Sequence, residues 1–241
     1  MIRSGNPALR GSIFTSGSVV ETTGTMTIQG TVNKALLLLM LTVLSASWVW
    51  SNAATLITLV MPAAILGFIA ALVTIFKKEW SAITAPLYAL LEGVFLGGIS
   101  AIFEAQYPGI VMQAVMLTFG VLFCLLMAYK SGAIKVTENF KLGVVAATGA
   151  VAMIYIVTII LGLFGVRVPF VHDAGPIGIG FSLVVVVIAS LNLVMDFDFI
   201  ESGEAAGAPK YMEWYGAFGL MVTLIWLYLE MLRLLAKLRS R

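Results

Sequence analysis

The stretch SLNLVMDFDFIESGEAAGAPKYMEWYGAFGLMVTLIWLYLEMLR, residues 190–233, shows the pattern on which the rest of the chain is built. An apolar run leads into Asp196 and Asp198, a short polar connection follows, and a second apolar run carries Glu230 inside it. We place five acids in the connection: Asp196, Asp198, Glu201, Glu204 and Glu213. Carboxylates at the edge of a bilayer or within it are costly, so these positions are the first candidates for function.

The composition of the whole chain indicates a membrane protein. Hydrophobic residues make up 61% and charged residues 11% of its 241 residues, and the mean hydropathy is +1.05. Soluble domains carry about 25% charged residues. The net charge of +2 comes without a dense basic stripe, which argues against a nucleic-acid partner. The single cysteine, Cys124, cannot form a disulfide within the chain.

The apolar runs predict an all-α bundle of seven transmembrane helices, since a span needs roughly 20 apolar residues. Residues 1–30 are predicted to be a flexible polar tail and residues 31–241 a single bundle in the lipid bilayer. The predicted spans are residues 35–50, 53–76, 81–103, 109–129, 142–164, 176–195 and 215–235.

The Lys and Arg residues of the predicted loops favour a cytoplasmic N-terminus, because cytoplasmic loops carry the excess of basic residues. Nearly all loop bases then lie inside, and Arg167 is the exception. The C-terminal bases break the bias if there are seven full spans: Arg233, Lys237, Arg239 and Arg241. Either this tail is an exception, or one late segment enters and leaves on the same side.

Glu92 falls in the middle of the third predicted span. Its carboxyl must face protein or water rather than lipid. It is either an ion or proton site, or a neutral glutamic acid hydrogen-bonded to a neighbouring helix.

Asp196 follows Asn192 by four residues, so the two side chains share a face if the helix continues. Asp198 lies about 200° further round and points elsewhere. The spacing therefore favours Asp196 as an inward-facing group. The simpler alternative is that both acids are solvated just beyond the membrane edge.

Glu230 follows Thr223 by seven residues, so these two also share a face. Arg233 lies three residues further on, and an ion pair with it is the simplest explanation of Glu230. Alternatively, Glu230 or a group on the same face meets Asp196 across the bundle. Two such carboxyls would share a proton and titrate as a unit, which would make a pH-dependent latch between two helices.

Other chemistry has little support in the sequence. No H-E-x-x-H zinc motif and no glycine-rich phosphate loop is present, and the lone histidine, His172, lies in a predicted loop. We therefore expect neither an enzyme nor a bound cofactor, and the sequence leaves metal binding undecided.

Several segments, taken in order, resemble the Bax inhibitor-1 family (transmembrane BAX inhibitor motif, YccA-type), in its bacterial Bax-inhibitor-1-like branch. LVMDFDFIE (193–201) and WLYLEMLRLL (226–235) carry the resemblance. It extends to TIQGTVNKALLLL (27–39), YALLEGVFLGGIS (88–100), YPGIVMQAVMLTF (107–119) and YKSGAIKVTENFKLGVVAATGA (129–150).

This resemblance implies a bundle in the bacterial inner membrane whose last helix is central. It also implies a pair of acids, from helices six and seven, that senses pH and gates a calcium leak. Asp196, with Ile200 four residues later, matches the first acid. Glu230 matches the second in the string Leu-Tyr-Leu-acid, whereas alignment on Arg233 puts Thr223 at that position.

The leading hypothesis is therefore a pH-sensitive calcium or cation leak. Its sensor would involve Asp196, Glu230 and Asp198, and its pathway Glu92, Asn192 and Thr223. The alternative is a regulatory membrane protein that conducts nothing and binds a membrane protease or a translocation component. A proton-coupled transporter is the third hypothesis.

Overall fold

The computed structural model describes residues 24–165 and 173–240. In this part of the chain, seven segments are long and apolar enough to cross a membrane, which confirms the predicted all-helical bundle. Their main helices are α1 (Ile28–Ser51), α3 (Val60–Phe76), α4 (Ser81–Gln106), α5 (Ile110–Lys130), α6 (Glu138–Leu163), α8 (Pro176–Ala205) and α9 (Met212–Arg239). Short helical turns lie between them: α2 (Ala53–Leu56), η3 (Ile57–Leu59) and η4 (Lys78–Trp80).

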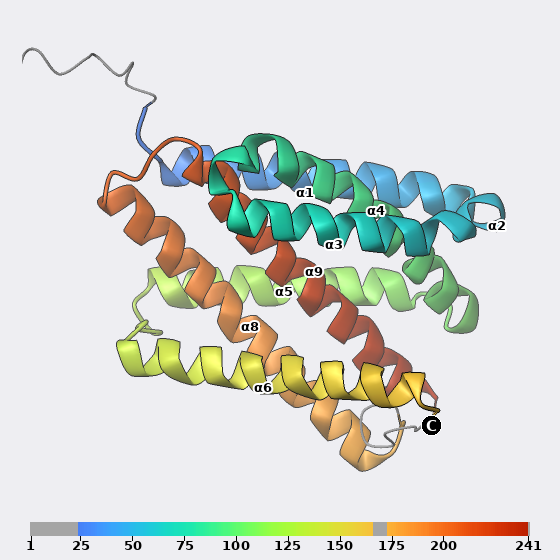
Figure 1. Ribbon diagram of the computed structural model, residues 1–241. Coiled ribbons are helices and arrows are strands. Elements are labelled where there is room, and N and C mark those ends of the chain that lie inside the picture. The colour runs from blue at the N-terminus through green and yellow to red at the C-terminus, as the bar shows by residue number, and fades with distance from the viewer. Residues whose placement is uncertain (1–23, 166–172, 241) are drawn as a thin grey trace, which may run out of the picture.

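The last helix, α9, is the centre of the bundle. It packs against α1, α4, α5 and α8, and Figure 1 shows it crossing between the α1–α3–α4 group and α8. One buried apolar cluster joins Phe218 and Met221 of α9 to α1, α3 and α4. A second joins Leu227 and Leu232 to α5 and α8. Since both clusters share α9, this helix holds the two sides together.

Two glycines allow α4 to lie directly against α1. A Cβ added to Gly97 would stand 2.4 Å from the backbone oxygen of Ala46, and one added to Gly93 would stand 2.5 Å from that of Thr42. Only glycine permits this approach, as the G-x-x-x-G spacing indicates for membrane helices.

The structure corrects the predicted connection between the last two spans. Helix α8 continues ten residues beyond Met195, so Asp196, Asp198, Glu201 and Glu204 are all helical, while Glu213 lies in α9. The connection covers only residues 206–211, and α8 ends just before Gly207, which has a φ of 64°. The prediction is wrong because hydropathy marks where the apolar layer ends, not where the helix ends. A helix makes its backbone hydrogen bonds internally and can continue beyond that layer.

Helix α6 lies at the edge of the bundle and packs mainly on α8 (Figure 1). Its buried residues, Val144, Val151 and Thr158, recur every seven positions and so form one stripe. The predicted flexible tail, residues 1–30, lies mostly outside the described part of the chain, and its last residues, 28–30, belong to α1. The predicted positions of Arg167 and His172 fall in residues 166–172, which are also outside it.

Candidate functional site

A cavity of about 770 Å³ lies between α3, α4, α8 and α9. Four of the residues selected from the sequence line it: Glu92, Asn192, Asp196 and Thr223. They come from three helices and are far apart in the chain. The structure thus brings the predicted pathway residues and one sensor residue to a single place.

Asp196 presents a carboxyl oxygen that nothing else uses. Its Oδ2 atom is buried and has no hydrogen-bond partner among the described residues. The hydroxyl of Thr223 lies against the same carboxyl group. Across from it, a Cβ at Gly219 would be 3.9 Å from Oδ1, an ordinary contact distance, so α9 passes close to the acid at this point. A buried oxygen without a partner is costly, and a cation or a proton would satisfy it.

Glu92 lines the cavity from α4 and reaches toward α3. A Cβ at Gly67 would be 3.3 Å from Glu92 Oε2, so glycine leaves room on α3 for this carboxyl group. The described residues that line the cavity include no Lys, Arg or His. The cavity therefore holds two acids that no base within it neutralises.

Asn192 connects the cavity to α6. Its Nδ2 atom donates to Thr148 Oγ1 and to the backbone oxygen of Ile188, both at 2.8 Å. Both bonds orient the amide, and the bond to Thr148 ties α6 to α8.

Glu230 has other partners and lies elsewhere. Its Oε1 atom accepts from the Tyr155 hydroxyl at 2.7 Å and from Arg233 Nη1 at 2.6 Å. Arg233 Nη1 also donates to the Tyr155 oxygen at 2.6 Å. The structure thus contains the ion pair that offered the simplest explanation of Glu230. No contact in the described residues joins it to Asp196, and the seven residues from Thr223 to Glu230 advance about 10 Å along α9.

Asp198 does not line the cavity. It forms an ion pair with Lys141 of α6 at 3.0 Å, and both side chains are partly exposed. Its direction agrees with the helical geometry that separated it from Asp196.

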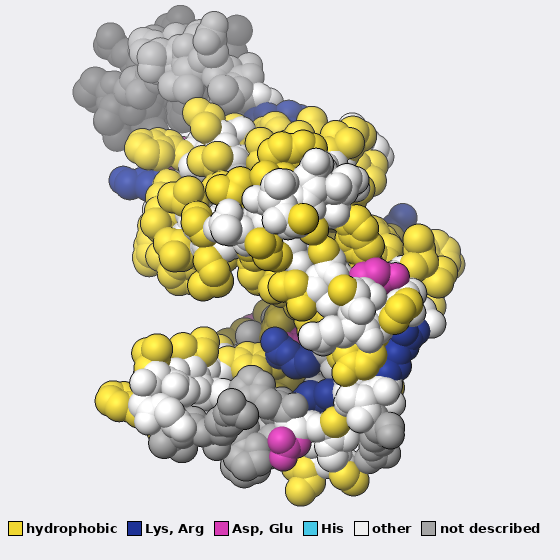
Figure 2. All heavy atoms as spheres, turned by 90° about the vertical axis from the view of Figure 1, so that its right-hand side faces the viewer, with side chains coloured by type: hydrophobic (Ala, Val, Ile, Leu, Met, Phe, Trp, Pro, Cys, Tyr) yellow, Lys and Arg dark blue, Asp and Glu magenta, His cyan; other side chains and the backbone are white. Residues whose placement is uncertain are grey.

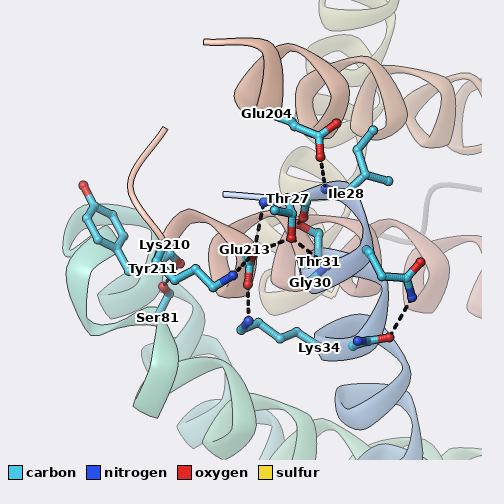
Figure 3. A network of polar contacts seen from close by, with 12 residues as sticks. Thr27, Ile28, Gly30, Thr31, Lys34, Ser81, Glu204, Lys210, Tyr211 and Glu213 are labelled. Carbon is cyan, nitrogen blue, oxygen red and sulfur yellow. Dashed lines mark hydrogen bonds and ion pairs between the residues drawn. The ribbon is translucent and has the colours of Figure 1, made fainter. Parts of the chain in front are cut away.

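Glu213 is a charged residue whose importance was not predicted from the sequence. Its side chain is fully buried and accepts from the backbone N–H of Thr27 at 2.9 Å and from the Thr27 hydroxyl at 2.8 Å. It pairs with Lys210 at 2.7 Å and with Lys34. Figure 3 shows the acid between the start of α1 and the start of α9.

The surroundings of Glu213 form a junction of four helices. A Cβ at Gly30 would stand 2.1 Å from its Oε1 atom, so α1 needs glycine there. Glu204, near the end of α8, accepts from Ile28 N at 2.9 Å. Ser81, at the start of α4, donates to Tyr211 O at 3.1 Å. In the sequence, the i,i+3 spacing of Lys210 and Glu213 is a weak sign of this site.

No group of three or more His, Cys, Asp or Glu that could hold a metal ion occurs in residues 24–165 and 173–240. Glu92 and Asp196, the two acids of the cavity, therefore do not belong to such a group.

Comparison with known proteins identifies the family. The model of the family described as "Bax inhibitor 1 like" matches residues 6–240. The chain belongs to the Bax inhibitor 1 like family. Comparisons with curated proteins and with solved structures gave no match. Because seven segments of its described residues are long and apolar enough to cross a membrane, this member of the Bax inhibitor 1 like family is a multi-pass membrane protein.

Proposed function

We propose that this Bax inhibitor 1 like protein is a pH-sensitive cation leak that passes calcium, and that it has no enzymatic activity. The observation that carries the proposal is that Glu92 and Asp196, from different helices, line one cavity without a basic partner in it. The family assignment agrees with this reading. The loop bases support a cytoplasmic N-terminus, and the bacterial inner membrane is what the resemblance to the bacterial branch of the family implies.

The cavity would serve as the entrance of the pathway. Along α9 it extends from Tyr215 to Thr223, which is the half of this helix closer to the N-terminus of α1. A cation that enters an apolar layer loses water, and oxygen ligands offset that loss. Asp196 and Glu92 provide charged oxygens, and Asn192 and Thr223 line the same space.

Protons would compete with cations for the same carboxyl groups, which makes the leak depend on pH. Besides the two acids, the titratable groups that line the cavity are Tyr88 of α4 and Tyr215 of α9. Lys78 Nζ lies 5.2 Å from the centre of the Tyr215 ring but is not part of the lining.

The cluster of Tyr155, Glu230 and Arg233 would close the pathway beyond the cavity. It bridges α6 and α9 further along α9, past Thr223. Breaking it would loosen this part of α6, which would then be held to α8 by its buried stripe and by the contacts of Thr148 and Lys141. In this proposal Asp196 binds the ion, and Glu230 keeps the pathway closed.

Calcium uptake into proteoliposomes, measured over a series of pH values, tests the proposal. We expect Asp196→Asn and Glu92→Gln each to reduce uptake and to flatten its pH dependence. Glu79→Gln, which removes an exposed acid of η4, is the matched control and should behave like wild type. If Asp196→Asn shows the uptake and pH profile of wild type, the proposed ion site is wrong.

A further inference from the structure

We propose that the cavity between α3, α4, α8 and α9 also binds hydrophobic organic cations that reach it sideways from the bilayer. This inference goes beyond the leak, because it concerns equilibrium binding and requires no conduction. It rests on the charge of the cavity, on its aromatic lining and on its open side.

The lining combines negative charge with aromatic rings. Asp196 contributes a buried oxygen with no described hydrogen-bond partner, and Glu92 contributes a second carboxyl group. Six aromatic side chains surround them: Phe68, Tyr88, Phe95, Phe199, Tyr215 and Phe218. Aromatic faces attract cations, and most strongly where water is scarce. A positive charge carried on an apolar body matches both features of this lining.

The side of the molecule is open next to one wall of the cavity. Figure 2 shows a deep hollow between the part of the molecule formed by α1, α3 and α4 and the part that contains α6. Helix α3, which lines one wall of the cavity, packs mainly on α4, while α6 packs mainly on α8. We take this hollow, which lies beside the α3 wall, as the side entrance of the cavity from the region that lipid chains occupy.

The side entrance selects the chemistry of the ligand. Helix α3 faces the cavity with Ala64, Phe68, Ala71 and Ile75, all of them apolar. A hydrated metal ion would have to lose its water along such a wall, which is costly. A hydrophobic cation spreads its charge over apolar groups, partitions into the bilayer and passes the wall at little cost. An anion of the same shape would meet two acids.

The volume agrees with this class of ligand. Sites for small organic molecules measure about 300–1,000 Å³, and this cavity measures about 770 Å³. It can therefore enclose a compact organic cation.

A matched pair of probes tests the inference. Tetraphenylphosphonium and tetraphenylborate have the same shape and opposite charge. Their binding to the full chain in lipid nanodiscs is measured by isothermal titration calorimetry, with empty nanodiscs as the reference. We expect saturable binding of the phosphonium ion alone. Asp196→Asn and Glu92→Gln should each weaken it by about tenfold or more, and Glu79→Gln should leave it unchanged.

Because substitution of an acid can alter the fold, a steric variant that keeps both acids provides a second test. Ala64→Trp fills the cavity from α3 and keeps both acids, so it should abolish phosphonium binding. Ala146→Trp, on the exposed side of α6, is its control and should bind like wild type. Equal binding of both probes, or phosphonium binding unaffected by Asp196→Asn and Ala64→Trp, would overturn the inference. Absence of calcium uptake with phosphonium binding intact would refute the leak alone.

Discussion

Replacing Glu213 by glutamine should destabilise the protein more than any other single acid-to-amide change in the described helices. The substitution keeps the shape of the side chain and an oxygen that can accept from Thr27. It removes the charge that Lys34 and Lys210 share. Lys34 is 19% exposed in its side chain and Lys210 47%, so Lys210 can turn to water while Lys34 loses a buried partner.

The structure sets the size of this effect. Removing one partner of a buried ion pair costs about 3–5 kcal/mol, whereas an exposed pair contributes about 0–1 kcal/mol. Because Glu213 is fully buried and one of its two lysines is half exposed, we expect about 3 kcal/mol. For a chain of this size, that loss lowers the midpoint of thermal unfolding by about 6–12 °C.

The assay is thermal unfolding in detergent micelles, followed by circular dichroism. Glu138→Gln is the matched control, because Glu138 is 91% exposed and its pair with Lys141 is long, at 3.5 Å. It should change the midpoint very little. Gly30→Ala should reproduce the effect of Glu213→Gln, since its methyl group would take the place of the carboxylate. A midpoint for Glu213→Gln within about 2 °C of wild type would refute the role of this junction.

Three further changes follow from contacts described above. Gly97→Ala should cost about 1–3 kcal/mol through overpacking against α1, whereas Gly120→Ala, where a Cβ meets nothing within 4 Å, should be neutral or stabilising; thermal unfolding compares them. Tyr155→Phe should cost about 1–2 kcal/mol and increase amide hydrogen exchange in α6, because the buried Glu230 loses a partly buried donor. Lys141→Met, which removes a partly exposed pair at the other end of α6, should cost about 0–1 kcal/mol and leave that exchange nearly unchanged.

The number and type of the helices could be predicted because a bilayer demands long apolar runs. The same criterion could not find where a helix ends. Hydropathy predicts that helix α8 stops at Met195, but the helix continues to Ala205. Its charged residues beyond Met195 are stabilised by partners on other helices, so they do not end the helix. Asp198 pairs with Lys141, and Glu204 accepts from Ile28 N. Such partners depend on the folded arrangement and leave no mark on hydropathy.

The candidate site could be predicted only in part, for a related reason. Helical spacing placed Asn192 and Asp196 on one face, and both line the cavity. That Glu92 joins them could not be inferred, because it required knowing which helices pack together. Glu213 was missed because the partner that buries it, Lys34, is 179 positions away in the chain.

Three of the four C-terminal bases that conflict with the loop-charge rule have partners among the described residues. Lys237 donates to Gly178 O and Ser182 Oγ, both at 2.9 Å, and Arg239 donates to the backbone oxygen of Pro108 at 2.8 Å. Arg233 is held by Glu230 at 2.6 Å. The orientation rule concerns bases in loops that stay in contact with water and lipid headgroups. Lys237 is buried and therefore acts in packing instead, whereas Arg239 is exposed and still counts against a cytoplasmic N-terminus with seven full spans.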